Sequence, residues 1–145
     1  MSVERCLKKQ VLVLGAGFGG LEFCRKFRHP DAEILLIDRQ NHHLFQPLLY
    51  QVATAGLSMP EVAEPVRSIL ARRKDVTVVM DEVREILLSE RKVACAKWTF
   101  AYDYLVIALG AVTSYFGHDE WEEFAPGLKS LDDAMRIRRD ILLAF

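Results

Sequence analysis

Three glycines near the start of the chain have the spacing of a phosphate-binding turn. The run Gly15-x-Gly17-x-x-Gly20 follows an apolar stretch at residues 11–14 and opens a stretch with helical periodicity. In this setting the first glycine permits a tight turn, the second lets the backbone approach a pyrophosphate, and the third lets a helix and a strand pack closely. The N–H groups at the helix start and the positive end of its dipole then face the phosphate charge.

A carboxylate follows the glycine turn at the position expected for ribose recognition. Asp38 ends a second apolar stretch, residues 33–38, and lies about 20 residues after the last glycine, as in dinucleotide-binding proteins. There it would accept hydrogen bonds from ribose hydroxyls and repel a 2′-phosphate. The alternative is a turn that only permits packing, beside an ordinary solvated acid. Taken together, the features favour a site for an ADP-containing dinucleotide, although the glycine spacing alone does not distinguish NAD from FAD.

The elements that must position these residues form one βαβ unit. Residues 11–14, and residues 34–37 within the stretch 33–38, are continuously apolar, as is typical of strands covered on both faces in a parallel sheet. Between them, residues 21–28 carry Phe23 and Phe27 on one helical face, and Pro30 ends that helix. The connection between the strands is expected to be right-handed.

The remaining sequence predicts an α/β fold. An aromatic-rich loop at 39–59, a helix at about 65–73 and a strand at 76–80 come first; a β-meander at about 83–101 and a strand at 104–109 follow. The spacing of Ser130 and Asp133 then predicts the capped start of an amphipathic helix. We expect a Rossmann-like FAD/NAD(P)-binding domain at 1–110, whose mostly parallel sheet carries helices on both faces and the small antiparallel meander. Residues 111–145 form a connecting loop and a helix.

Composition narrows the classes of partner. The 145 residues include 19 basic and 20 acidic ones, for a net charge of −1, which gives no electrostatic footprint for nucleic acid. The longest apolar run, residues 104–109, is far short of the roughly 18 residues that span a membrane. Cys6, Cys24 and Cys95 form no C-x-x-C pair; free thiols fit a cytoplasmic location. Neighbouring His42 and His43 have no third ligand nearby, so no metal site is predicted, and no catalytic residue is assigned.

Three segments resemble type II NADH dehydrogenases, which are flavoproteins with two dinucleotide-binding folds that act as non-proton-pumping NADH:quinone oxidoreductases. The segments are VLVLGAGFGG at 11–20, HLFQPLLYQVAT at 43–54 and YDYLVIALGA at 102–111. The middle segment is the specific one, because the other two occur throughout the superfamily. The likeness covers essentially the whole chain but only the front part of the family's longer sequence. We therefore expect that the NADH-binding domain and the membrane-attaching helices of the family are missing here.

The resemblance implies FAD as the cofactor, with NADH as co-substrate and a quinone as electron acceptor in the complete protein. Carried over by position, the turn at Gly15, Gly17, Phe18, Gly19 and Gly20 would meet the pyrophosphate, and Asp38 the adenosine ribose. Arg39 would lie near the adenine, Val83 would offer its backbone to the adenine edge, and His43 would belong to an FAD-contacting loop. Ala108, Leu109 and Gly110 would form a turn close to the cofactor. Phe45, Gln46 and Pro47 either pack near the flavin ring or close a loop over the core.

Two other functions stay open from the sequence: an NAD(P)-binding Rossmann oxidoreductase of another kind, and a truncated dinucleotide-binding module without catalysis. A bound yellow chromophore would favour the flavoprotein. The 145 residues alone are expected to be inactive, to bind FAD weakly and to self-associate through exposed apolar surface. The protein is expected to be cytoplasmic, and peripheral to the cytoplasmic membrane if the complete protein carries the C-terminal membrane-attaching helices of the family.

Overall fold

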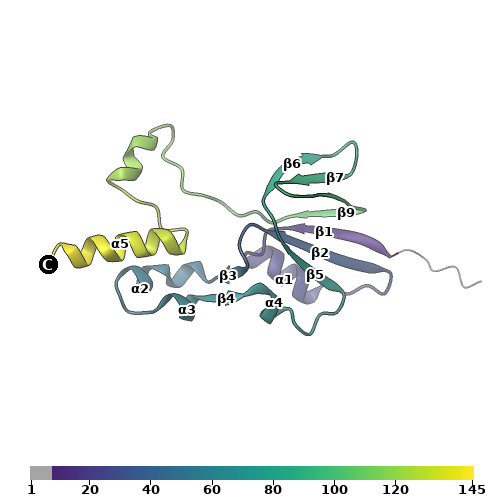
Figure 1. Ribbon diagram of the computed structural model, residues 1–145, viewed down its shortest axis with the longest axis horizontal. Helices are drawn as coiled ribbons and strands as arrows, with labels where there is room; N and C mark the ends of the chain where they lie inside the picture. The colour runs from purple at the N-terminus through teal and green to yellow at the C-terminus, as the bar shows by residue number, and fades with distance from the viewer. Residues whose placement is uncertain (1–7) are drawn as a thin grey trace, which may run out of the picture. The chain divides into compact units, whose positions relative to one another are not determined.

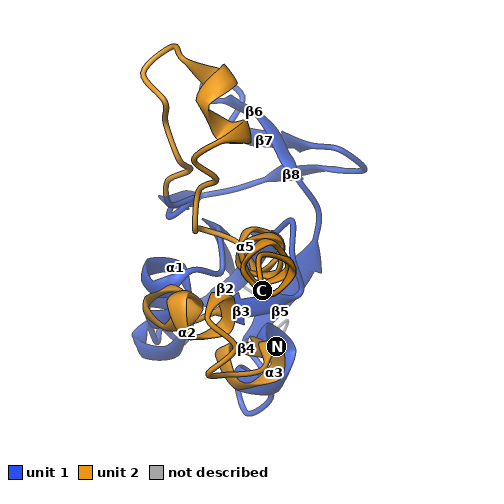
Figure 2. Ribbon diagram, turned by 90° about the vertical axis from the view of Figure 1, so that its left-hand side faces the viewer, with its two compact units in different colours: residues 1–43, 65–110 blue, residues 44–64, 111–145 orange. Residues whose placement is uncertain are grey.

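The computed structural model describes residues 8–145, so Cys6 lies outside the described part (Figure 1). The chain divides into two compact units, residues 1–43 with 65–110 and residues 44–64 with 111–145 (Figure 2). The segment 44–64 thus groups with the C-terminal residues. The functional division at residue 110 stays a prediction.

A four-stranded parallel sheet is the centre of the first unit. Its strands are β1 (Lys9–Leu14), β2 (Ala32–Asp38), β5 (Val76–Met80) and β9 (Tyr104–Ile107), in the order β5-β2-β1-β9. Val11 of β1 is in register with Ile34 of β2 and with Tyr104 of β9. The βαβ unit and the parallel sheet predicted from the apolar runs are therefore confirmed.

Two helices cover one face of this sheet. Leu21 and Cys24 of α1 (Phe18–Lys26) and Val66 of α4 (Val66–Ile69) are buried together with alternate strand residues such as Val13 and Leu36. Cys24 is fully buried, and this burial raises the pKa of its thiol to about 11. A thiol in this environment is unreactive and serves as a small apolar side chain.

An antiparallel sheet, rather than helices, covers the other face. It consists of β6 (Val83–Leu87), β7 (Lys92–Cys95) and β8 (Thr99–Ala101). Val93 of β7 is buried with the strand residues that point away from α1, among them Leu12 and Ile37. The predicted meander is confirmed, but the expectation of helices on both faces is wrong for the described residues. Pairing of β6, β7 and β8 gives the meander one apolar side, and that side packs on the parallel sheet.

Hydrogen bonds from Arg73 connect the residue before β5 to the end of α1. Its guanidinium donates to the carbonyl oxygens of Cys24 and Phe27, and its Nε lies 2.8 Å from Asp75 Oδ1. The hydrogen bond from Arg73 lowers the pKa of Asp75 to about 2. The helix predicted at 65–73 is shorter than expected, because α4 ends at Ile69. Arg73 lies beyond its end and makes these contacts instead.

The second unit is mainly helical. Where a loop was expected at 39–59, the structure has the short elements β3 (His42–Leu44), η1 (Gln46–Leu48) and α2 (Leu49–Ala53). The elements α3 (Met59–Val62), β4 (Ala63–Pro65), η2 (Asp119–Glu123) and α5 (Leu131–Leu143) follow. Leu49, Val52 and Ala134 form its core. At the start of α5, Ser130 Oγ accepts from Asp133 N at 3.1 Å, as the capping-box spacing predicts. No helix within residues 8–145 is long and apolar enough to cross a membrane.

Candidate functional site

The first and third glycines of the turn are required by packing. Gly15 has φ +97°, and a Cβ placed on it would lie 2.3 Å from the carbonyl oxygen of Ala108. A Cβ on Gly20 would lie 1.8 Å from the carbonyl oxygen of Gly15. Both distances are far below van der Waals contact, so the strand, the turn and α1 approach one another only because these residues lack side chains.

The second glycine is not required by packing. Gly17 has φ −68° and ψ −166°, which any residue can adopt, and a Cβ placed there would meet nothing within 4 Å. The backbone at Gly17 is thus open to an approaching group. An open backbone at this position fits the pyrophosphate of a dinucleotide, whose oxygens would occupy the space that a side chain would fill.

The first turn of α1 carries no acidic side chain of its own. No side chain caps this turn. The N–H groups of the first turn of a helix have no partner within the helix, and the helix dipole favours a negative charge near them. An anion bound here would therefore meet hydrogen-bond donors and no carboxylate from the helix itself.

Asp38 lies directly against the glycine turn. Its Oδ2 accepts a hydrogen bond from Ala16 N at 2.6 Å, and its Oδ1 accepts one from Gln40 N at 2.7 Å. These two bonds fix the orientation of the carboxylate, and each oxygen keeps acceptor capacity for a ribose hydroxyl. The glycine turn and Asp38 thus lie together at the carboxyl ends of the neighbouring strands β1 and β2.

His43 also packs against the turn. Its Nδ1 lies 3.0 Å from the carbonyl oxygen of Ala16, and its ring meets the Phe18 ring edge-on at 5.1 Å between centroids. A proton on Nδ1 makes this contact a hydrogen bond and leaves Nε2 as an acceptor. His43, distant in sequence, therefore forms one wall with Ala16 and Phe18 beside Gly17.

The turn after β9 completes the site. Ala108 N donates to Leu14 O at 2.8 Å, and Gly110 has φ +75°. The Ala108 methyl would lie 3.8 Å from a Cβ on Gly19. Ala108 is therefore next to the glycine turn, with Leu109 and Gly110 following it, although β9 ends at Ile107 rather than at residue 109.

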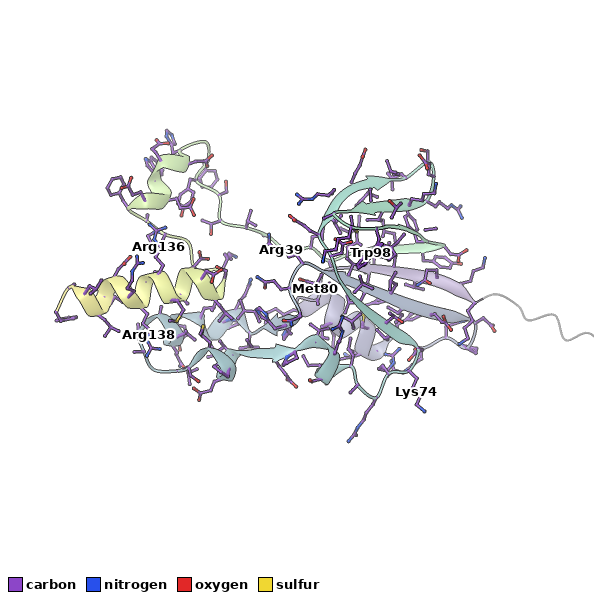
Figure 3. The ribbon with its side chains drawn as sticks, in the orientation of Figure 1. Arg39, Lys74, Met80, Trp98, Arg136 and Arg138 are labelled. Atoms are coloured by element: carbon purple, nitrogen blue, oxygen red, sulfur yellow. The ribbon has the colours of Figure 1, made fainter. Side chains whose placement is uncertain are left out.

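Arg39 and Val83 follow neighbouring strands. Arg39 comes directly after Asp38 and is exposed, while Val83 begins β6 just after the end of β5. Asp38 and Met80, the last residues of β2 and β5, are in register. The structure thus places Arg39 at the carboxyl end of β2, next to β1 (Figure 3), and Val83 just after β5, one strand further from the glycine turn.

Asp81 was not singled out from the sequence. Within residues 8–145, Asp81 is a charged residue that the fold buries. Its carboxylate accepts from the backbone N–H groups of Glu82, Lys97 and Trp98. Desolvation alone would raise the pKa of Asp81, but these hydrogen bonds and the Lys97 charge outweigh it, so the pKa is lowered. No local signal marks this residue, because its partners come from a turn later in the chain.

Comparison with known proteins agrees with this geometry. Residues 9–143 match the family model described as pyridine nucleotide-disulphide oxidoreductase. The type II NADH:quinone oxidoreductase Ndh of Mycobacterium tuberculosis is 45% identical over 142 residues, covering 95% of this chain and 31% of that protein. NdhA of the same organism is 44% identical, and the alignment covers 95% of this chain and 30% of NdhA. The chain thus spans about a third of the length of these relatives.

Solved structures show the same fold. NDH2 from Plasmodium falciparum in complex with NADH has a TM-score of 0.82 and 28% identity, over 90% of this chain and 28% of that one. The sulfide:quinone oxidoreductase of Aquifex aeolicus, at 20% identity, shares the fold with a TM-score of 0.79, over 92% of this chain and 32% of that one. The family model matches nearly the whole chain and the fold agrees, so the chain belongs to the pyridine nucleotide-disulphide oxidoreductase family.

Proposed function

We propose that this chain is the FAD-binding part of an NADH:quinone oxidoreductase. The named function of the two mycobacterial relatives supports the proposal, as does the similarity to a Plasmodium structure that contains NADH. Since the chain spans about a third of those relatives, the reaction belongs to a longer protein. Residues 1–110 would bind FAD, and residues 111–145 would lead towards an NADH-binding domain.

The observation that carries the proposal is the open backbone at Gly17. Gly15 and Gly20 are explained by packing, but Gly17 is explained by nothing within the fold, because a Cβ there meets no atom within 4 Å. A pyrophosphate gives the missing reason. Its charge would be met by the first turn of α1, and the wall of Ala16, Phe18 and His43 would hold it from the side.

Each predicted site residue then has a task. Asp38, fixed by Ala16 N and Gln40 N, would accept from the adenosine ribose. Arg39 and the backbone of Val83 would lie towards the adenine, and the turn at Ala108, Leu109 and Gly110 would pass close to the cofactor beside Gly19. Gly15, Gly17, Phe18, Gly19 and Gly20 would surround the pyrophosphate.

When bound, FAD supplies acceptance of a hydride from NADH and delivery of two electrons to a quinone, while the protein supplies orientation and exclusion of water. None of the residues proposed here performs a proton transfer, so we assign no catalytic residue. The complete protein would act at the surface of a membrane, where its quinone dissolves. We infer that the 145 residues alone bind FAD without turning over NADH.

A single substitution tests the proposal. Gly17→Val adds a side chain in open space, so we expect the free energy of unfolding to change by less than about 1 kcal/mol, the effect of altering a helix N-cap. The same side chain would occupy the pyrophosphate position. We expect the dissociation constants for ADP and FAD, measured by calorimetry, to rise at least tenfold, whereas the unmutated chain binds both competitively in the micromolar range.

Gly56→Ala, a glycine change in the second unit where a Cβ would make ordinary contact with Gln51, is the control and should leave both dissociation constants unchanged. An unaltered ADP affinity in Gly17→Val would contradict the proposal. Nanomolar retention of FAD, or oxidation of NADH with a quinone acceptor by the purified 145 residues, would contradict the part that assigns turnover to the longer protein.

A further inference from the structure

The topology of the sheet sets the direction in which a nucleotide would lie along it. The glycine turn follows β1, the ribose acid Asp38 ends β2, and β5 is the next strand along the edge. A nucleotide with its pyrophosphate at β1 and its ribose at β2 therefore places its base beside the end of β5. Asp81 N donates to Asp38 O at 3.0 Å, so the residue after β5 is in direct contact with the ribose acid.

Hydrogen bonds hold the turn at residues 96–98, between β7 and β8, against the residues that follow β5. Asp81 Oδ2 lies 3.2 Å from both Lys97 N and Trp98 N, and Ala96 N donates to Glu82 O at 2.8 Å. Asp81 is only 4% exposed. A buried carboxylate is costly unless hydrogen bonds satisfy it, and these backbone donors satisfy it only while the 96–98 turn stays docked. Asp81 thus holds the turn against the end of β5.

The turn presents a large flat side chain to solvent beside β5. The Trp98 side chain is 54% exposed and that of Met80, the last residue of β5, is 45% exposed. The Phe100 ring supports the indole edge-on at 6.4 Å between centroids, and Lys97 Nζ lies 5.8 Å from its centroid. Met80 and Trp98 lie in the same region of Figure 3, and the bond from Trp98 N to Asp81 fixes this neighbourhood.

We propose that the 96–98 turn, held by Asp81, forms the base-contacting wall of the nucleotide site, with the Trp98 indole packing on the adenine beside Met80. This inference rests on the proposed dinucleotide function. An exposed indole next to a thioether offers the apolar, polarisable surface that a purine ring requires. Asp81 is a positioning residue, because it acts on the base only through the turn.

Binding measurements with two probes separate the base from the phosphates. Stacking of a base on an aromatic side chain contributes enough that its removal weakens binding roughly 5- to 100-fold. In Trp98→Ala we expect the dissociation constant for ADP to rise within this range, while that for inorganic pyrophosphate stays unchanged. Trp98→Phe should restore most of the ADP affinity, and Trp121→Ala, which alters the chain's other tryptophan in the second unit, should leave it unchanged.

Fluorescence gives a readout independent of affinity. In a Trp121→Phe background Trp98 is the sole tryptophan, and its emission should change with ADP and saturate at the calorimetric dissociation constant. Adding Asp81→Asn removes an acceptor of the turn. The emission of the ligand-free chain should then move to longer wavelength, and the response to ADP should shrink. Adding Gly17→Val instead should abolish the response without shifting the ligand-free emission.

The outcomes distinguish this inference from the proposed function. If ADP binding depends on Gly17 but Trp98→Ala binds ADP as tightly as the unmutated chain, the base wall is overturned and the dinucleotide site stands. An ADP response carried by Trp121 instead of Trp98 overturns it as well. If the unmutated chain binds neither ADP nor pyrophosphate, the proposed function fails, and this inference fails with it.

Discussion

Gly17 and Gly20 belong to one motif, but a glycine is needed at the two positions for different reasons. At Gly20 the requirement is internal, because a Cβ would lie 1.8 Å from a backbone oxygen of the same turn. At Gly17 no contact within the fold requires a glycine, because the space is open, and only the proposed function requires one. Under the proposed function, mutation of the two residues therefore separates an effect on stability from an effect on binding.

Gly20→Ala should destabilise the fold. The added methyl meets the Gly15 carbonyl, which is backbone and cannot rotate away, so strand and helix must separate. We expect a loss of about 3 kcal/mol, typical of an overpacked core, measured as a lower midpoint of urea unfolding by circular dichroism. Gly17→Ala, in open space, is the matched control. An unchanged midpoint in Gly20→Ala would show that the close approach of α1 to the turn is wrong.

The sequence could predict the packing roles of Gly15 and Gly20, because the motif relates each of these positions to a fixed contact. The same holds for Asp38, whose place at the end of an apolar strand determines which edge it occupies. Asp81 could not be predicted. It lies between Met80 and Glu82 in a stretch that suggests a solvated turn, and its burial depends on where residues 97 and 98 fold back.

Among the elements, those with a strong local signal were predictable. β1 and β2 contain continuous apolar runs, β5 is rich in β-branched residues, and α5 begins at a capping box. The element that covers the second face of the parallel sheet could not be predicted, because a meander and a helix can both bury an apolar surface. The choice is made by contacts such as Val93 with Leu12 and Ile37, which are far apart in sequence.

The connection between α1 and β5 predicts a pH dependence of stability. The pKa of Asp75 falls from 3.8 to about 2 in the folded protein because Arg73 donates to it. A lowered folded-state pKa stabilises the fold above the unfolded value, so the contribution is complete above about pH 4 and disappears as the pH falls towards 2. Because the Asp75 side chain is 32% exposed, we discount the stabilisation for screening to about 1 kcal/mol.

Urea unfolding at pH 6 and pH 3 measures this contribution. The unmutated chain should lose more stability between the two pH values than Asp75→Asn, and the difference removes the effect of other carboxylates. Asp31→Asn, a nearby exposed acid with no hydrogen bond to Arg73, should behave like the unmutated chain. Equal losses in the Asp75 variant and the unmutated chain would mean that the Arg73–Asp75 pair does not stabilise the fold.

At the scale of the whole molecule, apolar exposure is the dominant feature of the second unit. Phe116, Phe124, Leu143 and Phe145 are each more than three-quarters exposed. Contiguous exposed apolar surface promotes association in water. The chain should therefore self-associate, with a mean mass by light scattering that rises with concentration.

Leu143→Glu combined with Phe145→Glu should lower that mass towards the monomer. Leu88→Glu, an equally exposed leucine in the first unit, is the control and should leave the mass unchanged. A monomer at all concentrations would contradict the prediction. So would a mass that falls equally in the control.

The pairing of β9 with β1 has a consequence for synthesis on the ribosome. Ala108 supplies both the backbone bond to Leu14 and the carbonyl that packs against Gly15, yet it is translated long after the glycines. A nascent chain that has released only its first hundred residues has the glycine turn but lacks the strand beside it. Under the proposed function, capture of a nucleotide during translation must therefore wait until β9 leaves the exit tunnel and the sheet closes.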